Sequence, residues 1–241
     1  MIIVYGTRLY GKVDKCGETH LATKFFHISW LPLIPLGTHL VLERQGGGSY
    51  RFLPQPLSGK SIAAALFRTW GLVGALGVAA GSLSAFGVAM DSYREGEGPG
   101  GLFVWPLIVL AAIAFVVFAF RFGRLAPVRA AQQSVYAGFV GYPVDVARFG
   151  ERRGEVRHVV TEELAKRAQG LGLLGYRNDA AAANYGVLAL DPMVTDGPFL
   201  DAALTLARLD WADAPRAERS EKAAVHQRIW KKIERRVQPA A

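Results

Sequence analysis

The sequence predicts an integral membrane α-helical hairpin, with a small N-terminal β-rich module and a C-terminal, mainly α-helical domain. Three observations support this fold class. Two long apolar runs lie in residues 61–121, short β-branched and aromatic runs fill residues 1–58, and helix-period patterns follow in residues 122–241. We take these three ranges as the expected domains.

The N-terminal module contains several short runs that are typical of strands. They cover residues 2–5, 9–13, 23–30, 38–43 and 50–53, with glycines and prolines between them. Such spacing predicts a small meander or ribbon-like sheet.

Within this module, residues 22–43 read ATKFFHISWLPLIPLGTHLVLE. This stretch, about a tenth of the chain, resembles the strand–PLIP–strand segment of zinc-ribbon-like modules in small bacterial membrane proteins. Modules of that kind normally hold zinc with paired cysteines. The chain has one cysteine, Cys16, so the resemblance implies a degenerate, metal-free ribbon.

An alternative is that Cys16, His20, His27 and His39 bind a metal, because four nitrogen and sulfur ligands would suit zinc. The alternative function is then a membrane-bound metal-dependent module or enzyme. Closely spaced ligand pairs at both ends are not evident, so we expect ordinary strand histidines and no cofactor.

The run at residues 30–36, WLPLIPL, is strongly apolar for a loop. We expect it to pack under the small sheet. The alternative is an interfacial segment that rests on a membrane, with Trp30 at headgroup depth.

The two predicted spans are residues 71–90 and 102–120, with 20 and 19 residues and no charge. At about 1.5 Å per residue, each covers roughly the 30 Å hydrocarbon layer of a bilayer. Neither span holds an ionisable residue, which argues against an ion path or a proton relay.

Small residues follow one side of the first span, with Gly74, Gly77 and Gly81 as its helix-packing candidates. Small side chains let helix backbones approach closely in lipid. We expect this side to receive the second span of the same chain, and the alternative is contact between copies in a homo-oligomer.

Positive charges flank the hairpin on its open side. Lys60 and Arg68 precede the first span, and Arg121, Arg124 and Arg129 follow the second, while the connecting turn has a net charge of −2. The positive-inside rule therefore predicts a multi-pass protein of the inner (cytoplasmic) membrane with both termini in the cytoplasm. Attraction to anionic lipids accounts for the net charge of +8, so we expect no nucleic-acid partner.

Helix-period stripes predict four helices in the C-terminal domain, at residues 127–139, 155–169, 198–209 and 216–237. Residues 185–190 suit either a helix end or a short strand. The last helix either docks on the domain by its apolar stripe or lies on the anionic leaflet or a partner. Asp191 and Asp196 are expected at caps or turns rather than in a carboxylate site.

These features favour a non-enzymatic membrane anchor or scaffold for cytoplasmic protein–protein interaction. The expected partners are the lipid bilayer and a protein partner or a second copy of the chain.

Overall fold

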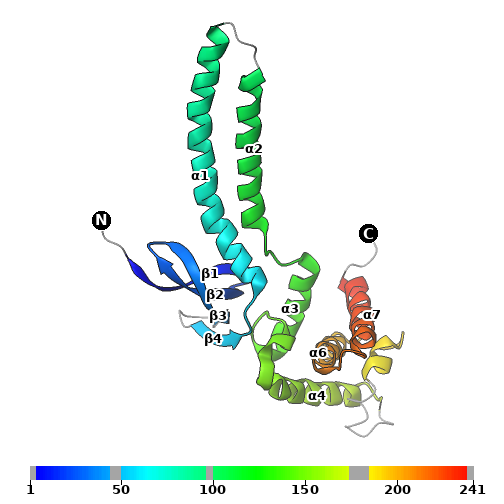
Figure 1. Cartoon of the computed structure of the whole chain (residues 1–241). Coiled ribbons are helices and arrows are strands. Elements are labelled where there is room, and N and C mark those ends of the chain that lie inside the picture. Colours follow the sequence, from blue (N-terminus) through cyan, green and yellow to red (C-terminus); the bar gives the residue numbers. More distant parts are fainter. Residues whose placement is uncertain (1–3, 44–49, 96–99, 174–184, 238–241) are drawn as a thin grey trace. The chain divides into compact units, whose positions relative to one another are not determined.

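The computed structural model of the chain describes residues 4–43, 50–95, 100–173 and 185–237. The chain forms two compact units, Met1–Leu125 and Ala126–Ala241. The first holds a four-stranded sheet and a long helical hairpin, and the second is mostly helical (Figure 1).

The sheet is an antiparallel meander in the order β1-β2-β3-β4. Its strands are β1 (Tyr5–Cys16), β2 (Thr19–Ile28), β3 (Leu31–Glu43) and β4 (Tyr50–Gln55). The predicted β-rich module is confirmed, with fewer and longer strands than the sequence runs indicate. The runs at 2–5 and 9–13 belong to one strand from Tyr5 onward, and residues 2 and 3 lie outside the described part.

Strand β3 extends through the proline-rich run that we expected to be a loop. Pro32 and Pro35 pair with β2 on one side, while β4 pairs with β3 only from Thr38 onward. At both prolines β3 is therefore an edge strand, where a missing N–H removes no ladder hydrogen bond. The β2–β3 register shifts twice next to these residues, which accommodates the prolines.

The sheet completes its core with a helix rather than with its own loops. Val13, Leu21, Phe25 and Leu40 are at most 5% exposed. In α1 (Gly59–Arg94), the first two turns bury Ser61, Ala64 and Ala65 against the sheet. A sheet this small needs such a cover, because four short strands alone bury too little apolar surface.

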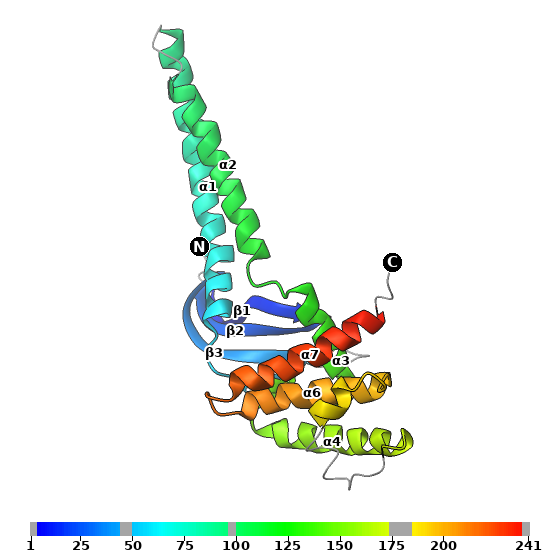
Figure 2. The ribbon, with the colours of Figure 1, turned by 90° about the vertical axis from the view of Figure 1, so that its right-hand side faces the viewer.

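Helix α1 has 36 residues and α2 (Gly100–Arg121) has 22, and they run side by side as an antiparallel hairpin (Figures 1 and 2). Helix α1 begins twelve residues before the apolar run at 71–90. Ser58 caps it, with its hydroxyl oxygen accepting from the Ser61 N–H at 3.3 Å. Both helices are long and apolar enough to cross a membrane.

The second unit contains α3 (Pro127–Val140), the 3₁₀ helix η1 (Val146–Arg152), α4 (Arg153–Gly170), a short helix at residues 185–190, α6 (Gly197–Asp213) and α7 (Arg219–Val237). The four predicted helices are all present, with ends shifted by up to four residues. Residues 185–190, which suited either a helix or a strand, are helical. The mainly helical character of this region is confirmed.

Helix α6 is the centre of the second unit and packs against α3, α4 and α7. Ten of its seventeen residues are buried, including Phe199, Leu204 and Leu209. Helix α7 docks on this core through Ile229 and Ile233, members of its predicted apolar stripe. Docking leaves Arg228 and Lys231 exposed, whereas Lys232 donates to the carbonyl oxygens of Ala189 and Asp191 at 2.9 and 2.5 Å.

Candidate interaction surfaces

The four candidate metal ligands are spread along the sheet. Cys16 ends β1 and His20 lies near the start of β2, whereas His27 lies at the far end of β2. His39 is in β3, and its ring packs edge-on against Phe52 with the ring centroids 6.4 Å apart. Among the described residues, no three His, Cys, Asp or Glu side chains gather as a metal site would require. The metal-dependent alternative therefore gains no support.

The small-residue side of α1 does not receive α2. A Cβ added at Gly74, Gly77 or Gly81 would have no atom of another element within 4 Å. The close approach is at Gly71, where a Cβ would lie 2.5 Å from Cε1 of Phe115. At about 100° of rotation per residue, Gly74, Gly77 and Gly81 are separated from Gly71 by about 60°, 120° and 80° around the helix axis. The expectation that they pack against α2 is wrong, and contact with a second copy stays a prediction.

Buried hydroxyl groups join the sheet to the start of α1. Thr23 Oγ1 lies 2.9 Å from Thr38 Oγ1 and donates to Ser61 Oγ at 2.9 Å. Ser61 Oγ in turn donates to the Gly11 carbonyl at 2.7 Å, and the Ser58 N–H donates to Thr38 at 3.0 Å. Each group has a partner, so the cluster avoids the cost of unpaired buried polar atoms. We call these five residues the hydroxyl junction.

Arg68 adds a second link between the sheet and the hairpin. Its guanidinium donates to the carbonyl oxygens of Lys12 in β1 at 2.8 Å and of Ala119 and Phe122 at the end of α2 at 3.2 and 2.8 Å. A cation at a helix C-terminus satisfies the last carbonyls and suits the helix dipole. One side chain thus holds β1, α1 and α2 together at the base of the hairpin.

The apolar run at residues 30–36 is exposed, which overturns the expectation that it packs under the sheet. Trp30 is 51% exposed, Ile34 56% and Leu36 53%. The run is nevertheless fixed in place. Trp70 of α1 donates from Nε1 to the Pro32 carbonyl at 3.2 Å, and the Tyr10 hydroxyl donates to the Trp30 carbonyl at 3.1 Å.

A groove of about 480 Å³ opens on the second unit between α3, α4 and α6. Its apolar lining comes from Val135, Phe139, Val159 and Pro198, and its charged lining from Glu162, Glu163, Lys166 and Asp201. Three carboxylates and one ammonium give these lining residues a net charge of −2, which the Arg167 guanidinium, 2.7 Å from Glu163, offsets in part. We call this feature the acidic groove.

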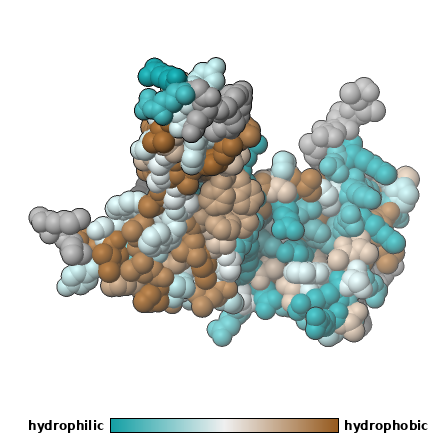
Figure 3. Space-filling model, turned by 45° about the horizontal axis from the view of Figure 1, so that its top comes forward, coloured by the Kyte–Doolittle hydropathy of each residue, from teal (hydrophilic) through white to brown (hydrophobic). Residues whose placement is uncertain are grey.

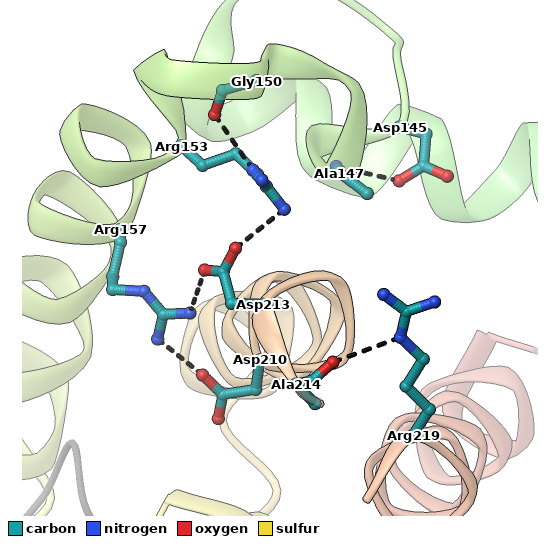
Figure 4. Close-up of polar contacts among 9 residues, drawn as sticks. All are labelled: Asp145, Ala147, Gly150, Arg153, Arg157, Asp210, Asp213, Ala214 and Arg219. Atoms are coloured by element: carbon teal, nitrogen blue, oxygen red, sulfur yellow. Dashed lines mark hydrogen bonds and ion pairs between the residues drawn. The ribbon is translucent and has the colours of Figure 1, made fainter. Parts of the chain in front are cut away.

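The acidic residues near the end of α6 bind arginines of α4 (Figure 4). Arg157 contacts Asp210 at 2.5 Å and Asp213 at 2.9 Å, and Arg153 contacts Asp213 at 2.7 Å. The Tyr185 hydroxyl also donates to Asp210, at 2.7 Å. These pairs fasten α4 to α6 and leave the carboxylates engaged, which argues for a structural role.

Asp191 and Asp196 take the cap and turn positions expected for them. The Asp196 side chain accepts from the Phe199 N–H at 2.9 Å at the start of α6. Asp191 accepts from the Met193 N–H at 2.9 Å. Both interactions satisfy backbone donors that helix starts and turns leave free.

A partly buried polar cluster in the second unit was not foreseen from the sequence. Arg208 forms a two-point ion pair with Asp145, and the Tyr136 hydroxyl lies 2.8 Å from Nε2 of His226. Burial, with a smaller contribution from the nearby Arg208, lowers the pKa of His226 to about 4. The bond to Arg208 keeps the pKa of Asp145 below its usual value in spite of burial. His226 is therefore neutral near pH 7.

No local signal in the sequence pointed to this cluster, because Asp145 and Arg208 are 63 residues apart. The same holds for the acidic groove, whose residues come from three separate helices. Comparison with protein-family models, with curated proteins and with solved structures found no match for the chain. The function must therefore be argued from the surfaces themselves.

Proposed function

We propose that this protein is a non-enzymatic, two-span membrane protein that holds a protein partner at the cytoplasmic face of the membrane. The observation that carries the proposal is the exposure of the two apolar helices. Only 6% of each candidate span window is buried, whereas a core helix of a soluble protein is mostly buried. Side chains such as Leu76, Leu83 and Leu107, at 63, 76 and 65% exposed, require an apolar environment outside the chain.

A bilayer supplies that environment, and both helices satisfy their own backbone hydrogen bonds as a bilayer requires. The charge distribution supports the orientation. Lys60, Arg68, Arg121 and Arg124 lie at the base of the hairpin, and the turn at its other end is acidic. Both termini are then cytoplasmic.

The acidic groove supports the scaffold function. Its apolar floor and acidic side chains match an amphipathic helix whose apolar face is bordered by lysines or arginines. We propose such a basic helical segment of another protein as its occupant. A second copy of this chain, joined through the small-residue side of α1, remains the other proposed partner.

Reporter fusions test the membrane proposal. A reporter placed after Ala241 is expected to be active only in its cytoplasmic form, and one placed within residues 96–99 only in its external form. Equal behaviour of the two fusions would contradict a two-span hairpin.

Covalent cross-linking in native membranes tests the groove. The variant Val159→Lys places a positive charge on the apolar lining of the acidic groove, and Val187→Lys is its control at an exposed apolar position in the same unit. We expect the Val159 variant to lose specific cross-linked species that wild type and the control retain. Identical cross-linking patterns in all three proteins would rule out the groove as the docking site.

A further inference from the structure

One end of the sheet carries a cluster of exposed apolar side chains, at the turn from β2 to β3 and the start of β1. Its main members are Tyr5, Ile28, Trp30, Leu33, Ile34 and Leu36, which are between 41 and 75% exposed. We call this cluster the apolar tip. The opposite end of the β1–β2 ladder is charged, with Lys15 and Glu18 forming an exposed ion pair at 3.3 Å. Strands β1 and β2 are therefore charged at one end and apolar at the other.

Helix α1 runs along the sheet toward the apolar tip. Just before the helix, the Ser58 N–H donates to Thr38 of β3, and twelve residues later Trp70 donates to the carbonyl of Pro32, six residues back along β3. Twelve helical residues cover about 18 Å and six strand residues about 20 Å, so between these two hydrogen bonds α1 and β3 cover nearly the same distance. The tip thus lies level with Trp70, one residue before the apolar run at 71–90 begins.

Figure 3 tips the hairpin end of the molecule toward the viewer, and in this view the sheet exposes an apolar surface. It lies beside the base of the hairpin, within the same unit. We propose that the apolar tip inserts into the headgroup–acyl boundary of the cytoplasmic leaflet, so that its partner is the lipid surface. This inference rests on the proposed insertion of α1 and α2.

Position and chemistry favour lipid as the occupant. The tip is continuous with the base of a proposed span, and Trp70 of that helix donates to the Pro32 carbonyl within the tip. The tip also contains Trp30, and Trp is a residue type enriched at membrane interfaces. Arg8 and Lys24 are exposed on the neighbouring stretches of β1 and β2. Positive charges flanking an apolar surface suit anionic headgroups.

The test uses the full chain in vesicles of phosphatidylcholine and phosphatidylglycerol, in a Cys16→Ser background. A spin label is attached at Ile34→Cys, and the collision rates of the label with oxygen and with a water-soluble nickel chelate are measured. Glu18→Cys at the charged end of the sheet is the aqueous control, and Leu83→Cys in α1 is the hydrocarbon control. A second tip label at Leu36→Cys guards against a local disturbance at one site.

We expect both tip labels to favour oxygen over the chelate and to lie about 5–10 Å into the boundary region. Tip labels that collide with the chelate as freely as the Glu18 label, while the Leu83 label does not, would overturn the tip inference and leave the hairpin intact. Tip labels shielded from both reagents would also overturn it, because they would indicate a protein contact such as a second copy. A Leu83 label open to the chelate would refute the membrane proposal itself.

Discussion

Gly11 lies where the sheet meets α1 most closely, so we predict that Gly11→Ala separates the two elements. The residue has a φ of +65°, and an added Cβ would lie 1.9 Å from the Ser61 carbonyl oxygen. Ordinary contact begins at 3.4 Å, so the helix would have to retreat by about 1.5 Å. The Ser61 hydroxyl could then no longer reach the Gly11 carbonyl, which it now contacts at 2.7 Å.

Two costs add up in this variant. The left-handed backbone conformation costs a residue with a Cβ about 1–2 kcal/mol. A buried hydroxyl that loses its partner costs about 1–3 kcal/mol more. We therefore expect the docking of the sheet on α1 to weaken by about 2–5 kcal/mol.

Hydrogen–deuterium exchange of the full chain in nanodiscs measures this loss. At about 1.4 kcal/mol per factor of ten, the lower value corresponds to roughly 30-fold faster exchange in β1 and in the first turns of α1. The matched control is Gly6→Ala in the same strand, where the added Cβ has its nearest neighbour, His27 Nε2, at an ordinary 3.7 Å. Equal exchange in the two variants would show that the close approach at Gly11 does not determine docking.

Three further predictions concern pH, the Asp145–Arg208 ion pair and the hairpin. Burial holds the pKa of His226 near 4, so as pH falls the unfolded chain takes up the proton before the folded chain does. The contribution of His226 to the free energy of unfolding is full above pH 6.5 and falls by up to about 3 kcal/mol as pH drops to 4. Unfolding curves of His226→Phe should lack this pH dependence. Asp145→Asn removes the negative charge that pairs with the partly buried Arg208 and should lower the free energy of unfolding by about 3 kcal/mol, measured by denaturant titration. Gly71→Leu should destabilise the hairpin in detergent by about 1–3 kcal/mol, whereas Gly77→Leu, at a position that faces open space, should leave the stability of the monomer unchanged. The reverse result would show that α2 packs against the Gly77 side of α1 and not against Gly71.

Local patterns predicted much of this fold. The strand-rich first 58 residues, the two apolar helices and the helical C-terminal unit follow from residue type and period, which act over a few residues. Asp196 was expected at a cap or turn and caps α6 for the same reason. Capping and periodicity need no knowledge of distant contacts.

The misjudged features all depend on contacts between distant segments. The run at residues 30–36 contains two prolines, which locally indicate a loop, yet the absence of β4 beside it makes an edge strand permissible. Gly74, Gly77 and Gly81 line one side of α1 with small residues, but α2 approaches at Gly71 instead, through Phe115. A list of small residues does not reveal which side of a helix its neighbour will occupy.

The hydroxyl junction fixes the register between α1 and the sheet. The burial of apolar side chains between α1 and the sheet is non-directional, so it selects a register less sharply than hydrogen bonds do. Thr23, Thr38 and Ser61 form hydrogen bonds in only one register, and a slip of one residue would leave buried hydroxyls unpaired. Because α1 and β3 advance together, that register sets the height of the apolar tip relative to Trp70. If the tip rests in the leaflet as proposed, the depth of the sheet at the membrane depends on three hydroxyl groups, those of Thr23 and Thr38 in the sheet and of Ser61 at the start of α1.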